Sequence, residues 1–386
     1  MRALHIGIDA SNIRQGGGVT HLSQVLAAAK PESIGVDRVT VWACPATLSA
    51  LPERSWLVRR CPPWVRASLP YRVLGQQWAL PRALKRELCD VLFSPGGTLP
   101  RRCAIPVVTM SQNMLPFEPD EARLFGQASP VRMKMRLLRF SQGRSLLSAD
   151  GVIFLTRYAQ HTVCVALGGV NGDTALIPHG IEKRFFQPPR PVRTLTDCSK
   201  VCPFRLLYVS ILMPYKHQIE VARAVSRLRG EGLPIEIHFV GAPFGWYGEM
   251  VRKECSRLDP AGDFLHLVGA VPFDALHSLY GVADAFLFAS SCENLPNILI
   301  EAMAAGLPIL SSGCGPMPEV LGDAGLYFDP YSSEEIANAL RSFVVDVNRR
   351  AVLASAAFQK ASEYSWERCA TDTFAFVAKV ARQRTA

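Results

Sequence analysis

The sequence predicts an α/β protein of two similar domains, each built on a parallel sheet with helices on both faces. Short apolar runs alternate with helical patterns, stop in a polar, proline-rich stretch at residues 187–203, and then resume. Strands that alternate with helices are typical of parallel sheets, whose strands are buried on both faces. A length of 386 residues with 49% apolar residues gives two such domains enough material for large cores.

The first domain is expected to span residues 1–187. Its first apolar run, ALHIGIDA, is followed by three consecutive glycines, Gly16–Gly18, and then by a helical pattern. The later strand-like runs are RVTVWAC (38–44), DVLFSPG (90–96), IPVVTM (105–110), GVIFLT (151–156) and TALIPHG (174–180). A linker is expected at residues 188–203, because this stretch is rich in proline and short polar residues.

The second domain is expected at residues 204–365. It begins with the strand-like run FRLLYVSIL (204–212) and the helix-like run HQIEVARAVSRLRG (217–230). The alternation continues with strand-like runs at 235–241, 264–271, 285–291 and 307–312, and with helix-like runs at 249–258, 273–283, 297–306 and 335–347. A last helix, residues 366–386, is expected to cross back and pack on the first domain.

The composition argues against several classes of protein. No stretch of about 20 apolar residues predicts a transmembrane helix. Asp9 interrupts the N-terminal apolar run, so this segment does not resemble a signal peptide, and we expect a cytoplasmic protein. The 11 cysteines are scattered, and the closest pair, Cys198 and Cys202, has no nearby histidine to complete a zinc site. We expect the cysteines to be reduced and mostly buried.

The net charge of +9 is distributed unevenly along the chain. Residues 1–190 contain 24 Lys and Arg against 12 Asp and Glu, whereas the rest contains 18 against 21. The basic residues of the first half are interleaved with Trp56, Trp64 and Trp78. This pattern favours an anionic membrane surface over nucleic acid, since no nucleic-acid-binding motif accompanies it. The alternative is solvated charge over core tryptophans. The candidate surface residues are Arg59, Arg60 and Arg66.

Two glutamates, Glu293 and Glu301, lie eight residues apart in SSCENLPNILIEAMAAGLP (290–308). The segment follows a buried strand, and ligands of parallel sheets bind beyond the carboxyl ends of strands. Pro296 suits the first turn of a helix that Gly306 ends. The N–H groups at the start of that helix then form a site for a diphosphate. Glu301 is placed to accept from ribose hydroxyls, and Glu293 from hydroxyls of a sugar beyond the phosphates.

Several segments in order resemble glycosyltransferase family 4, the group 1 glycosyltransferases of GT-B fold. They are ENLPNILIEAMAAGLPILSSGCGPMPEVLGDAGLYFDP, DASNIRQGGGVTHLSQVL, LIPHGIEKRFF, LLYVSILMPYKHQIEVARAV and YSWERCATDTFAFV. The resemblance covers almost the whole chain. It implies two Rossmann-like domains that face each other across a cleft. It also implies a retaining, metal-independent hexosyltransferase that uses a nucleotide-sugar as substrate and needs no cofactor.

The resemblance also assigns roles to residues. Glu293 would bind the donor sugar and Lys216 would neutralise the diphosphate leaving group, which makes them the candidate catalytic residues. Glu301 would hold the ribose, and Gly17 and Gly18 would let the first-domain loop approach the phosphates. The backbone N–H groups for the sugar and diphosphate would come from Leu295, Asn297 and Ile298.

Two departures from the family pattern concern the donor. The arginine that many members carry is replaced here by Ile211, after Ser210. The histidine that many members carry after the fourth strand is also missing. The residues that would take its place are Ser111, Gln112 and Asn113. His21 is either a phosphate donor or a residue that packs a helix, and His179 is expected to shape a turn.

The predicted function is the transfer of a hexose to a glycan acceptor, lipid-linked, in bacterial surface polysaccharide assembly at the inner face of the plasma membrane. The first alternative is a catalytically weak nucleotide-sugar-binding scaffold in an assembly complex, which the two missing residues favour. A nucleotide-sugar epimerase or a phosphorylase of the same fold is a second alternative, because fold does not fix reaction. A NAD enzyme is disfavoured, since Gly16–Gly18 does not fit G-x-G-x-x-G.

Overall fold

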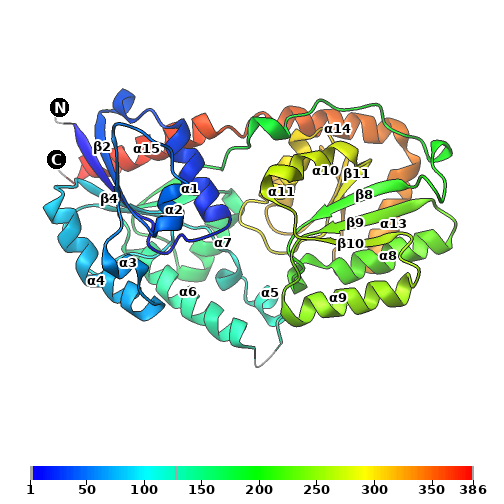
Figure 1. Ribbon diagram of the computed structural model, residues 1–386, viewed down its shortest axis with the longest axis horizontal. Coiled ribbons are helices and arrows are strands. Elements are labelled where there is room, and N and C mark those ends of the chain that lie inside the picture. The colour runs from blue at the N-terminus through cyan, green and yellow to red at the C-terminus, as the bar shows by residue number, and fades with distance from the viewer. Residues whose placement is uncertain (1–2, 127–128, 385–386) are drawn as a thin grey trace. The chain divides into compact units, whose positions relative to one another are not determined.

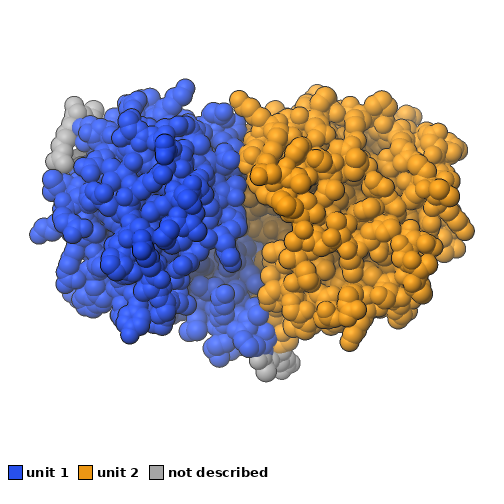
Figure 2. All heavy atoms as spheres, in the orientation of Figure 1, with its two compact units in different colours: residues 1–118, 128–180, 365–386 blue, residues 119–127, 181–364 orange. Residues whose placement is uncertain are grey.

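The computed structural model describes residues 3–126 and 129–384 of the chain (Figure 1). The chain divides into two compact units (Figure 2). Unit 1 comprises residues 1–118, 128–180 and 365–386, and unit 2 comprises residues 119–127 and 181–364. The chain thus passes from unit 1 to unit 2 after Gly180, whereas the sequence placed a linker at 188–203.

Unit 1 contains a seven-stranded sheet in the order β3-β2-β1-β4-β5-β6-β7. Every neighbouring pair is parallel, as expected for strands that are joined through helices. The central strands are apolar and buried on both faces, which explains their continuous apolar runs. The strands are β1 (Leu4–Asp9), β2 (Val36–Trp42), β3 (Leu57–Arg60), β4 (Val91–Ser94), β5 (Val107–Met110), β6 (Gly151–Phe154) and β7 (Asp173–Leu176).

The helices of unit 1 connect these strands, and the C-terminal helix joins them. The α-helices are α1 (Gly17–Ala28), α2 (Pro45–Ser49), α3 (Pro63–Arg66), α4 (Leu69–Arg86), α6 (Pro130–Ser148), α7 (Arg157–Leu167) and α15 (Trp366–Gln383). The 3₁₀ helices are η1 (Pro31–Ile34) and η2 (Leu115–Phe117). Helix α15 packs against α1, β4, β5 and β6, with one apolar face buried. Gly180 allows this approach, since a Cβ there would lie 2.1 Å from the Trp366 nitrogen.

Unit 2 contains a six-stranded parallel sheet in the order β10-β9-β8-β11-β12-β13. The order reverses between β8, the first strand, and its neighbour β11. Such a reversal opens a crevice at the carboxyl ends of the two strands, where ligands of doubly wound sheets bind. The strands are β8 (Phe204–Val209), β9 (Ile235–Val240), β10 (Leu265–Gly269), β11 (Ala285–Phe288), β12 (Ile309–Ser312) and β13 (Leu326–Phe328).

The helices of unit 2 cover both faces of this sheet (Figure 1). The α-helices are α5 (Pro119–Arg123), α8 (Gln218–Gly230), α9 (Gly245–Leu258), α10 (Leu276–Val282), α11 (Asn297–Ala304), α12 (Met317–Leu321), α13 (Ser333–Val345) and α14 (Val347–Ala361). The 3₁₀ helices are η3 (Lys183–Phe185), η4 (Leu195–Asp197), η5 (Pro214–Lys216) and η6 (Phe273–Ala275). The predicted α/β architecture of two parallel-sheet domains is therefore confirmed.

The cysteines differ in part from the prediction. All 11 are free thiols, but only five are buried. Cys202 is exposed and five others are half-buried, because several lie on loops and helix surfaces rather than in strands. Across residues 3–126 and 129–384, the helices are all too short or too polar to cross a bilayer.

Candidate active site

Lys216 and Glu293 lie at the point where the strand order of unit 2 reverses. Lys216 ends η5, which follows β8, and Glu293 lies in the loop that follows β11. The Lys216 ammonium donates to a Glu293 carboxylate oxygen, and both side chains are largely buried. The Lys216 Nζ also lies 5.3 Å from the centre of the Phe288 ring. The structure thus brings together the two predicted catalytic residues as an ion pair at the expected edge of the sheet.

The backbone around Lys216 is held by a side chain of β8 and by the backbone of the loop that follows β11. The Tyr208 hydroxyl, from β8, donates to the Lys216 carbonyl at 2.5 Å, and the Ser291 N–H donates to the Tyr215 carbonyl at 2.9 Å. The next residue, His217, adopts the left-handed conformation with φ of 51°. A non-glycine residue there costs free energy and persists only where its surroundings fix it. The turn therefore holds the lysine in one place.

Glu301 is buried inside α11, with 4% of its surface exposed. The Tyr280 hydroxyl, from α10, donates to Glu301 Oε2 at 3.0 Å. Burial raises the pKa of Glu301 to about 8, although the Tyr280 hydrogen bond opposes this change. The alternative of a solvated helix residue is excluded, because the side chain is buried among apolar neighbours. Most molecules therefore carry a neutral Glu301 carboxyl at pH 7.

The N-terminus of α11 differs in detail from the expectation. Pro296 is the residue before the helix rather than a residue of its first turn, and the helix begins at Asn297. The Asn297 N–H donates to the Leu295 carbonyl at 2.9 Å, so this predicted phosphate donor is already used in the structure. Leu295 is buried and Ile298 is half-buried. Ile211, which stands where many family members carry arginine, is half exposed at 50%.

The glycine loop of unit 1 connects β1 to α1. Gly16 has a φ of 69°, which favours glycine, and it precedes the first helical residue, Gly17. A Cβ on Gly17 would meet no described atom within 4 Å, so packing of the protein does not require glycine there. A Cβ on Gly18 would lie 3.7 Å from the Gln112 side-chain oxygen. The structure thus brings Gln112 close to the glycine loop.

Ser111 and Asn113 flank Gln112 in the segment after β5. Ser111 is buried, and its N–H continues the sheet by donating to the Ile153 carbonyl at 3.0 Å. The Asn113 side chain accepts from the Leu115 N–H at 3.3 Å and so starts η2. Of the three predicted sugar contacts, Ser111 and Asn113 are therefore engaged in shaping the loop.

His21 is a packing residue, which decides between its two sequence interpretations. It is 1% exposed, and its ring stacks on that of His179 with 4.3 Å between centres. The His179 ring in turn stacks on Trp366 of α15 at 5.8 Å. Burial lowers the pKa of His21 well below its usual value, so the ring is neutral. A neutral, buried imidazole is no phosphate-binding cation, and the two histidines instead join α1 to α15.

The predicted basic surface of unit 1 is partly committed to internal contacts. Arg59 donates to the carbonyls of Leu51 and Pro52, and Arg60 pairs with Glu87 at 2.9 Å. Arg66 is exposed and donates to the Cys61 sulfur at 3.2 Å. The three tryptophans that surround them differ in exposure. Trp56 is buried, Trp64 is half-buried and Trp78 is 64% exposed.

The interpretation of Trp56 as a surface residue is therefore wrong. It is 8% exposed and packs edge-on against Phe374 of α15, with 6.4 Å between ring centres. The ring lies in the core because α15 returns from the end of the chain to cover this part of unit 1. Only Trp78, on α4, presents most of its surface to solvent.

Sequence reasoning missed a buried polar cluster behind the Lys216 turn. His217 Nε2 lies 2.9 Å from Ser291 Oγ, and Ser291 donates to Glu121 of α5 at 2.5 Å. The Tyr331 hydroxyl donates to the same carboxylate. Burial lowers the pKa of His217 to about 4, so this ring is neutral at pH 7. The position of His217 directly after Lys216 was a usable signal, whereas Glu121 is 170 residues from Ser291 and gave none.

A second missed group lies in unit 1, where the strand order reverses between β1 and β4. Asp9 ends β1, is buried, and accepts from Gln76 Nε2 at 2.6 Å and from the Ser11 N–H at 3.0 Å. Burial raises the pKa of this carboxyl. Gln76 also donates to Thr98, in the loop after β4. A carboxylate at the end of a buried strand was the signal for this site.

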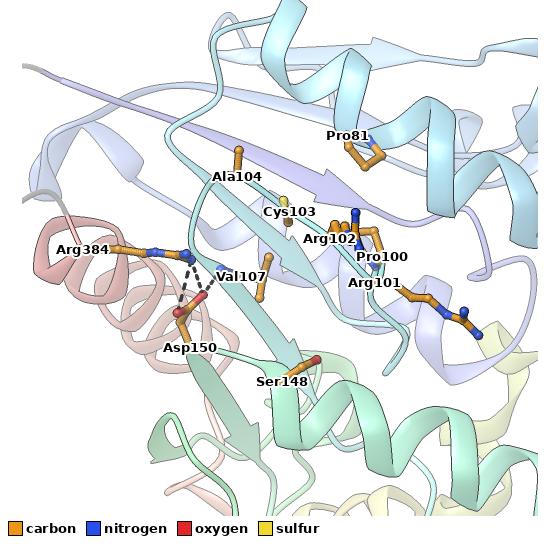
Figure 3. Close-up of a pocket in the computed structure, with 10 residues that line it drawn as sticks. All are labelled: Pro81, Pro100, Arg101, Arg102, Cys103, Ala104, Val107, Ser148, Asp150 and Arg384. Carbon is orange, nitrogen blue, oxygen red and sulfur yellow. Dashed lines mark hydrogen bonds and ion pairs between the residues drawn. The ribbon is translucent and has the colours of Figure 1, made fainter.

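A pocket of about 590 Å³ lies elsewhere in unit 1, where β5 and β6 begin (Figure 3). Its polar lining residues include Arg101, Arg102, Ser148, Asp150 and Arg384, and the last two form an ion pair at 3.3 Å. This is the amino edge of the strands, opposite to the edge where ligands of parallel sheets bind. None of the predicted site residues lines it.

Comparison with known proteins finds a matching family for the segment that contains Lys216, Glu293 and Glu301. Residues 200–360 match the family of group 1 glycosyl transferases. O-antigen chain mannosyltransferase B of Escherichia coli is 31% identical over 167 residues, which cover 43% of this chain and 44% of that protein. The match thus covers less than half the length of this relative.

Solved structures match over nearly the whole chain. Sucrose-phosphate synthase of Thermosynechococcus elongatus has a TM-score of 0.72 at 18% identity, and the match covers 99% of both chains. Anabaena HepE in complex with UDP-glucose has a TM-score of 0.68 at 18% identity, again covering 99% of both chains. The protein therefore has the fold of these structures, and the predicted GT-B class of two Rossmann-like domains is confirmed.

Proposed function

We propose that the protein is a retaining glycosyltransferase of family 4. It transfers a hexose from a nucleotide-sugar to a glycan acceptor, lipid-linked, in bacterial surface polysaccharide assembly. The observation that carries the proposal is the Lys216–Glu293 ion pair at the reversal of strand order, inside the segment that matches the group 1 glycosyl transferases. A cation and a carboxylate there suit a ligand with both phosphates and sugar hydroxyls.

Each residue has a part in the proposed reaction. As the bond between the sugar C1 and the phosphate oxygen breaks, negative charge builds on the diphosphate and the sugar ring becomes oxocarbenium-like. Lys216 and the N-terminus of α11 stabilise the departing diphosphate. The departing phosphate oxygen accepts the proton of the acceptor hydroxyl on the same face, which gives retention. Charge stabilisation in this scheme comes from Lys216 and the helix, so it requires neither a metal nor a cofactor.

A nucleotide-sugar-binding scaffold without strong activity is the second candidate. The observation that favours it is Ile211, an apolar and half-exposed side chain where many family members place an arginine. Such a protein would bind the donor and turn it over poorly, because one of two expected cations is missing. The transferase and the scaffold would therefore differ in the rate of turnover and not in donor binding.

A panel of nucleotide-sugars separates these functions from each other and from unrelated ones. We expect the melting temperature of the purified protein to rise with one UDP- or GDP-sugar, since a ligand at 100 times its Kd adds roughly 2.7 kcal/mol of stability. We also expect slow release of free sugar from the same donor, measured by coupled assay, because water can replace the acceptor. Stabilisation without release would favour the scaffold, and no stabilisation by any donor would contradict both.

The anionic membrane surface that we propose as a partner is served best by α4 and α6 of unit 1. Together these helices contain nine Lys and Arg and no acidic residue. On α4, three apolar residues at helical spacing are 53–68% exposed, namely Tyr71, Leu74 and Trp78. On α6, three more at helical spacing are 57–72% exposed, namely Met133, Leu137 and Phe140. Both helices pack against residues 97–101. Exposed apolar stripes flanked by cations are typical of helices that lie in a lipid interface.

Vesicle sedimentation tests this surface. Exchanging Trp78 and Phe140 together for serine should lower affinity for anionic vesicles at least about tenfold, since two exposed rings lose their place in the interface. The matched control changes Arg59, Arg60 and Arg66 to serine, and it should lose less, because Arg59 and Arg60 already serve internal contacts. Equal loss in both variants, or no binding by the unchanged protein at low salt, would contradict the assignment.

A further inference from the structure

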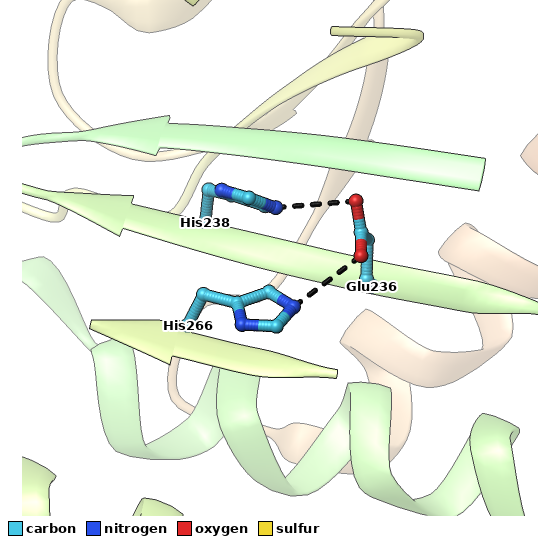
Figure 4. A group of neighbouring side chains, drawn as sticks. All are labelled: Glu236, His238 and His266. Atoms are coloured by element: carbon cyan, nitrogen blue, oxygen red, sulfur yellow. Dashed lines mark hydrogen bonds and ion pairs between the residues drawn. The ribbon is translucent and has the colours of Figure 1, made fainter. Parts of the chain in front are cut away.

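Three potential metal ligands lie on one face of the unit 2 sheet, away from the residues proposed for the donor. Glu236 and His238 are two positions apart on β9, so their side chains leave the same face. His266 on β10 pairs directly with His238 in the parallel register. Both imidazoles therefore point toward the Glu236 carboxylate (Figure 4). Because the register of two strands fixes this convergence, it does not depend on a mobile loop.

The separations of the ligand atoms suit a first-row divalent cation. His238 Nε2 lies 3.1 Å from Glu236 Oε1, and His266 Nε2 lies 3.3 Å from Oε2. All the ligand atoms lie within 4.8 Å of one another. In a tetrahedral zinc site with bonds of about 2.0–2.1 Å, neighbouring ligand atoms are roughly 3.3 Å apart. A cation can therefore replace the two hydrogen bonds with only small rotations of the three side chains.

The surroundings of the carboxylate prepare it as a ligand. Arg205 Nε donates to Glu236 Oε1 at 2.6 Å, which orients the group as outer-shell partners of metal ligands do. The side chains of His238 and His266 are 25% and 31% exposed, which leaves a path for the ion and space for water.

We propose that Glu236, His238 and His266 form a binding site for a divalent cation of the zinc class. Two imidazoles and one carboxylate are the donor set that such ions prefer over magnesium or calcium. The Arg205 guanidinium repels the ion, so the site binds it more weakly than a closed structural zinc site. The proposal is independent of the transfer reaction, which draws on other residues.

A bound ion would join the edge strand β10 to β9 through His266, the second residue of β10, and through Glu236 and His238 of β9. At their carboxyl ends the two strands are linked separately, since the Gly241 N–H donates to the Gly269 carbonyl at 2.8 Å. The β9–β10 pairing has an irregular register just after His266, between Leu267 and Gly269. A cation that bridges His238 and His266 would therefore stabilise the pairing directly before its irregular part.

Titration of the metal-free, reduced protein with Zn²⁺ or Co²⁺ alone tests the site. We expect one equivalent to bind and to raise the melting temperature. In the double variant His238→Gln and His266→Gln, the affinity should fall at least about tenfold. Exchanging the exposed His161 for Gln, in unit 1, is the matched control and should change nothing. Unchanged affinity in the double variant would overturn the proposal, and so would the absence of saturable binding.

Histidine modification of the unchanged protein gives a second readout that needs no variant. Diethyl pyrocarbonate labels accessible imidazoles, and mass spectrometry locates the label. Zn²⁺ should protect His238 and His266 severalfold and leave His161 unprotected. The free thiols of the chain are the competing ligands, and Co²⁺ separates them, because thiolate ligation adds a strong near-ultraviolet band that imidazole and carboxylate ligands lack. That band at the first equivalent, without protection of the two histidines, would assign the ion to cysteines and overturn the proposal.

Discussion

Replacing Lys216 by alanine is expected to lower kcat/KM about 100- to 1000-fold, the loss that follows when one preorganised donor to developing charge is removed. The reason lies in the position of the ammonium. It is held at the carboxyl edge of β8 and β11 by the Glu293 carboxylate, which belongs to the loop between β11 and α11. With Ile211 in place of the expected arginine, Lys216 is the one side-chain cation that we assign to the diphosphate, beside the N-terminus of α11. Steady-state kinetics with the donor found in the stability panel measures the effect.

The control for this variant is a double-mutant cycle of Lys216 and Glu293. Lys216→Arg keeps the charge and should retain more activity than Lys216→Ala, although its planar head fits the ion pair less well. Glu293→Ala should mainly reduce kcat, because its proposed role is to hold the sugar that reacts. Since the two side chains form one ion pair, the loss in the double variant should be smaller than the sum of the single losses. Less than a tenfold loss in Lys216→Ala would mean that another cation serves the leaving group.

Much of this arrangement could be predicted because it follows from local patterns. Most strands of both sheets correspond to the predicted apolar runs, although β3 and β13 were not predicted, and the helix start after SSCENLP follows from its proline. Once β8 and β11 are known to be neighbours, residues that follow them must meet at one edge of the sheet. The sequence placed Glu293 after a buried strand, whereas Lys216 was assigned through the family resemblance. Their meeting, 77 residues apart in the sequence, follows from the pairing of β8 with β11.

The parts that could not be predicted depend on packing between distant segments. Trp56 resembled a surface residue because its sequence neighbours are basic, but α15 covers it from the other end of the chain. The neutral state of Glu301 needs the Tyr280 hydroxyl and the apolar surroundings of α11, which no local pattern reports. The convergence of His238 and His266 needs the exact register of β9 and β10. Periodicity places residues on faces, and only pairing places them opposite each other.

Above pH 8, where most of the Glu301 carboxyl is ionised, replacing it by alanine is expected to weaken nucleotide binding about 10- to 100-fold, the range for hydrogen bonds to a charged group. The carboxylate is proposed to accept from the ribose hydroxyls, and alanine offers no acceptor. Isothermal titration with UDP, GDP and dTDP measures the loss. Glu301→Gln is the matched variant, because it keeps the shape and one acceptor oxygen, and it should lose less. Unchanged affinity for all three nucleotides in Glu301→Ala would sink the ribose assignment.

The raised pKa of Glu301 adds a pH dependence whose sign is fixed. The carboxyl has a pKa of about 8 in the folded protein, against an ordinary pKa of 4.5. Below about pH 4.5 both folded and unfolded chains carry the proton, so the group costs no stability. As the pH rises from 4.5 to 8 the unfolded chain loses the proton first, and the free energy of unfolding falls by an amount on the order of several kcal/mol. Above pH 8 the cost is constant.

Thermal unfolding of the unchanged protein and of Glu301→Gln across this range tests the sign. The glutamine in this variant cannot ionise. The melting temperature of the variant minus that of the unchanged protein should therefore increase as the pH rises from 5 to 8. Tyr280→Phe removes the hydrogen bond that lowers the Glu301 pKa, and it should extend the decline to higher pH. If the melting temperatures of all three proteins changed with pH in parallel, Glu301 would be ionised throughout.

Nucleotide affinity should rise with pH, whereas stability falls. We expect this rise in the unchanged protein and not in Glu301→Gln, because the ionised carboxylate is the better acceptor for ribose hydroxyls.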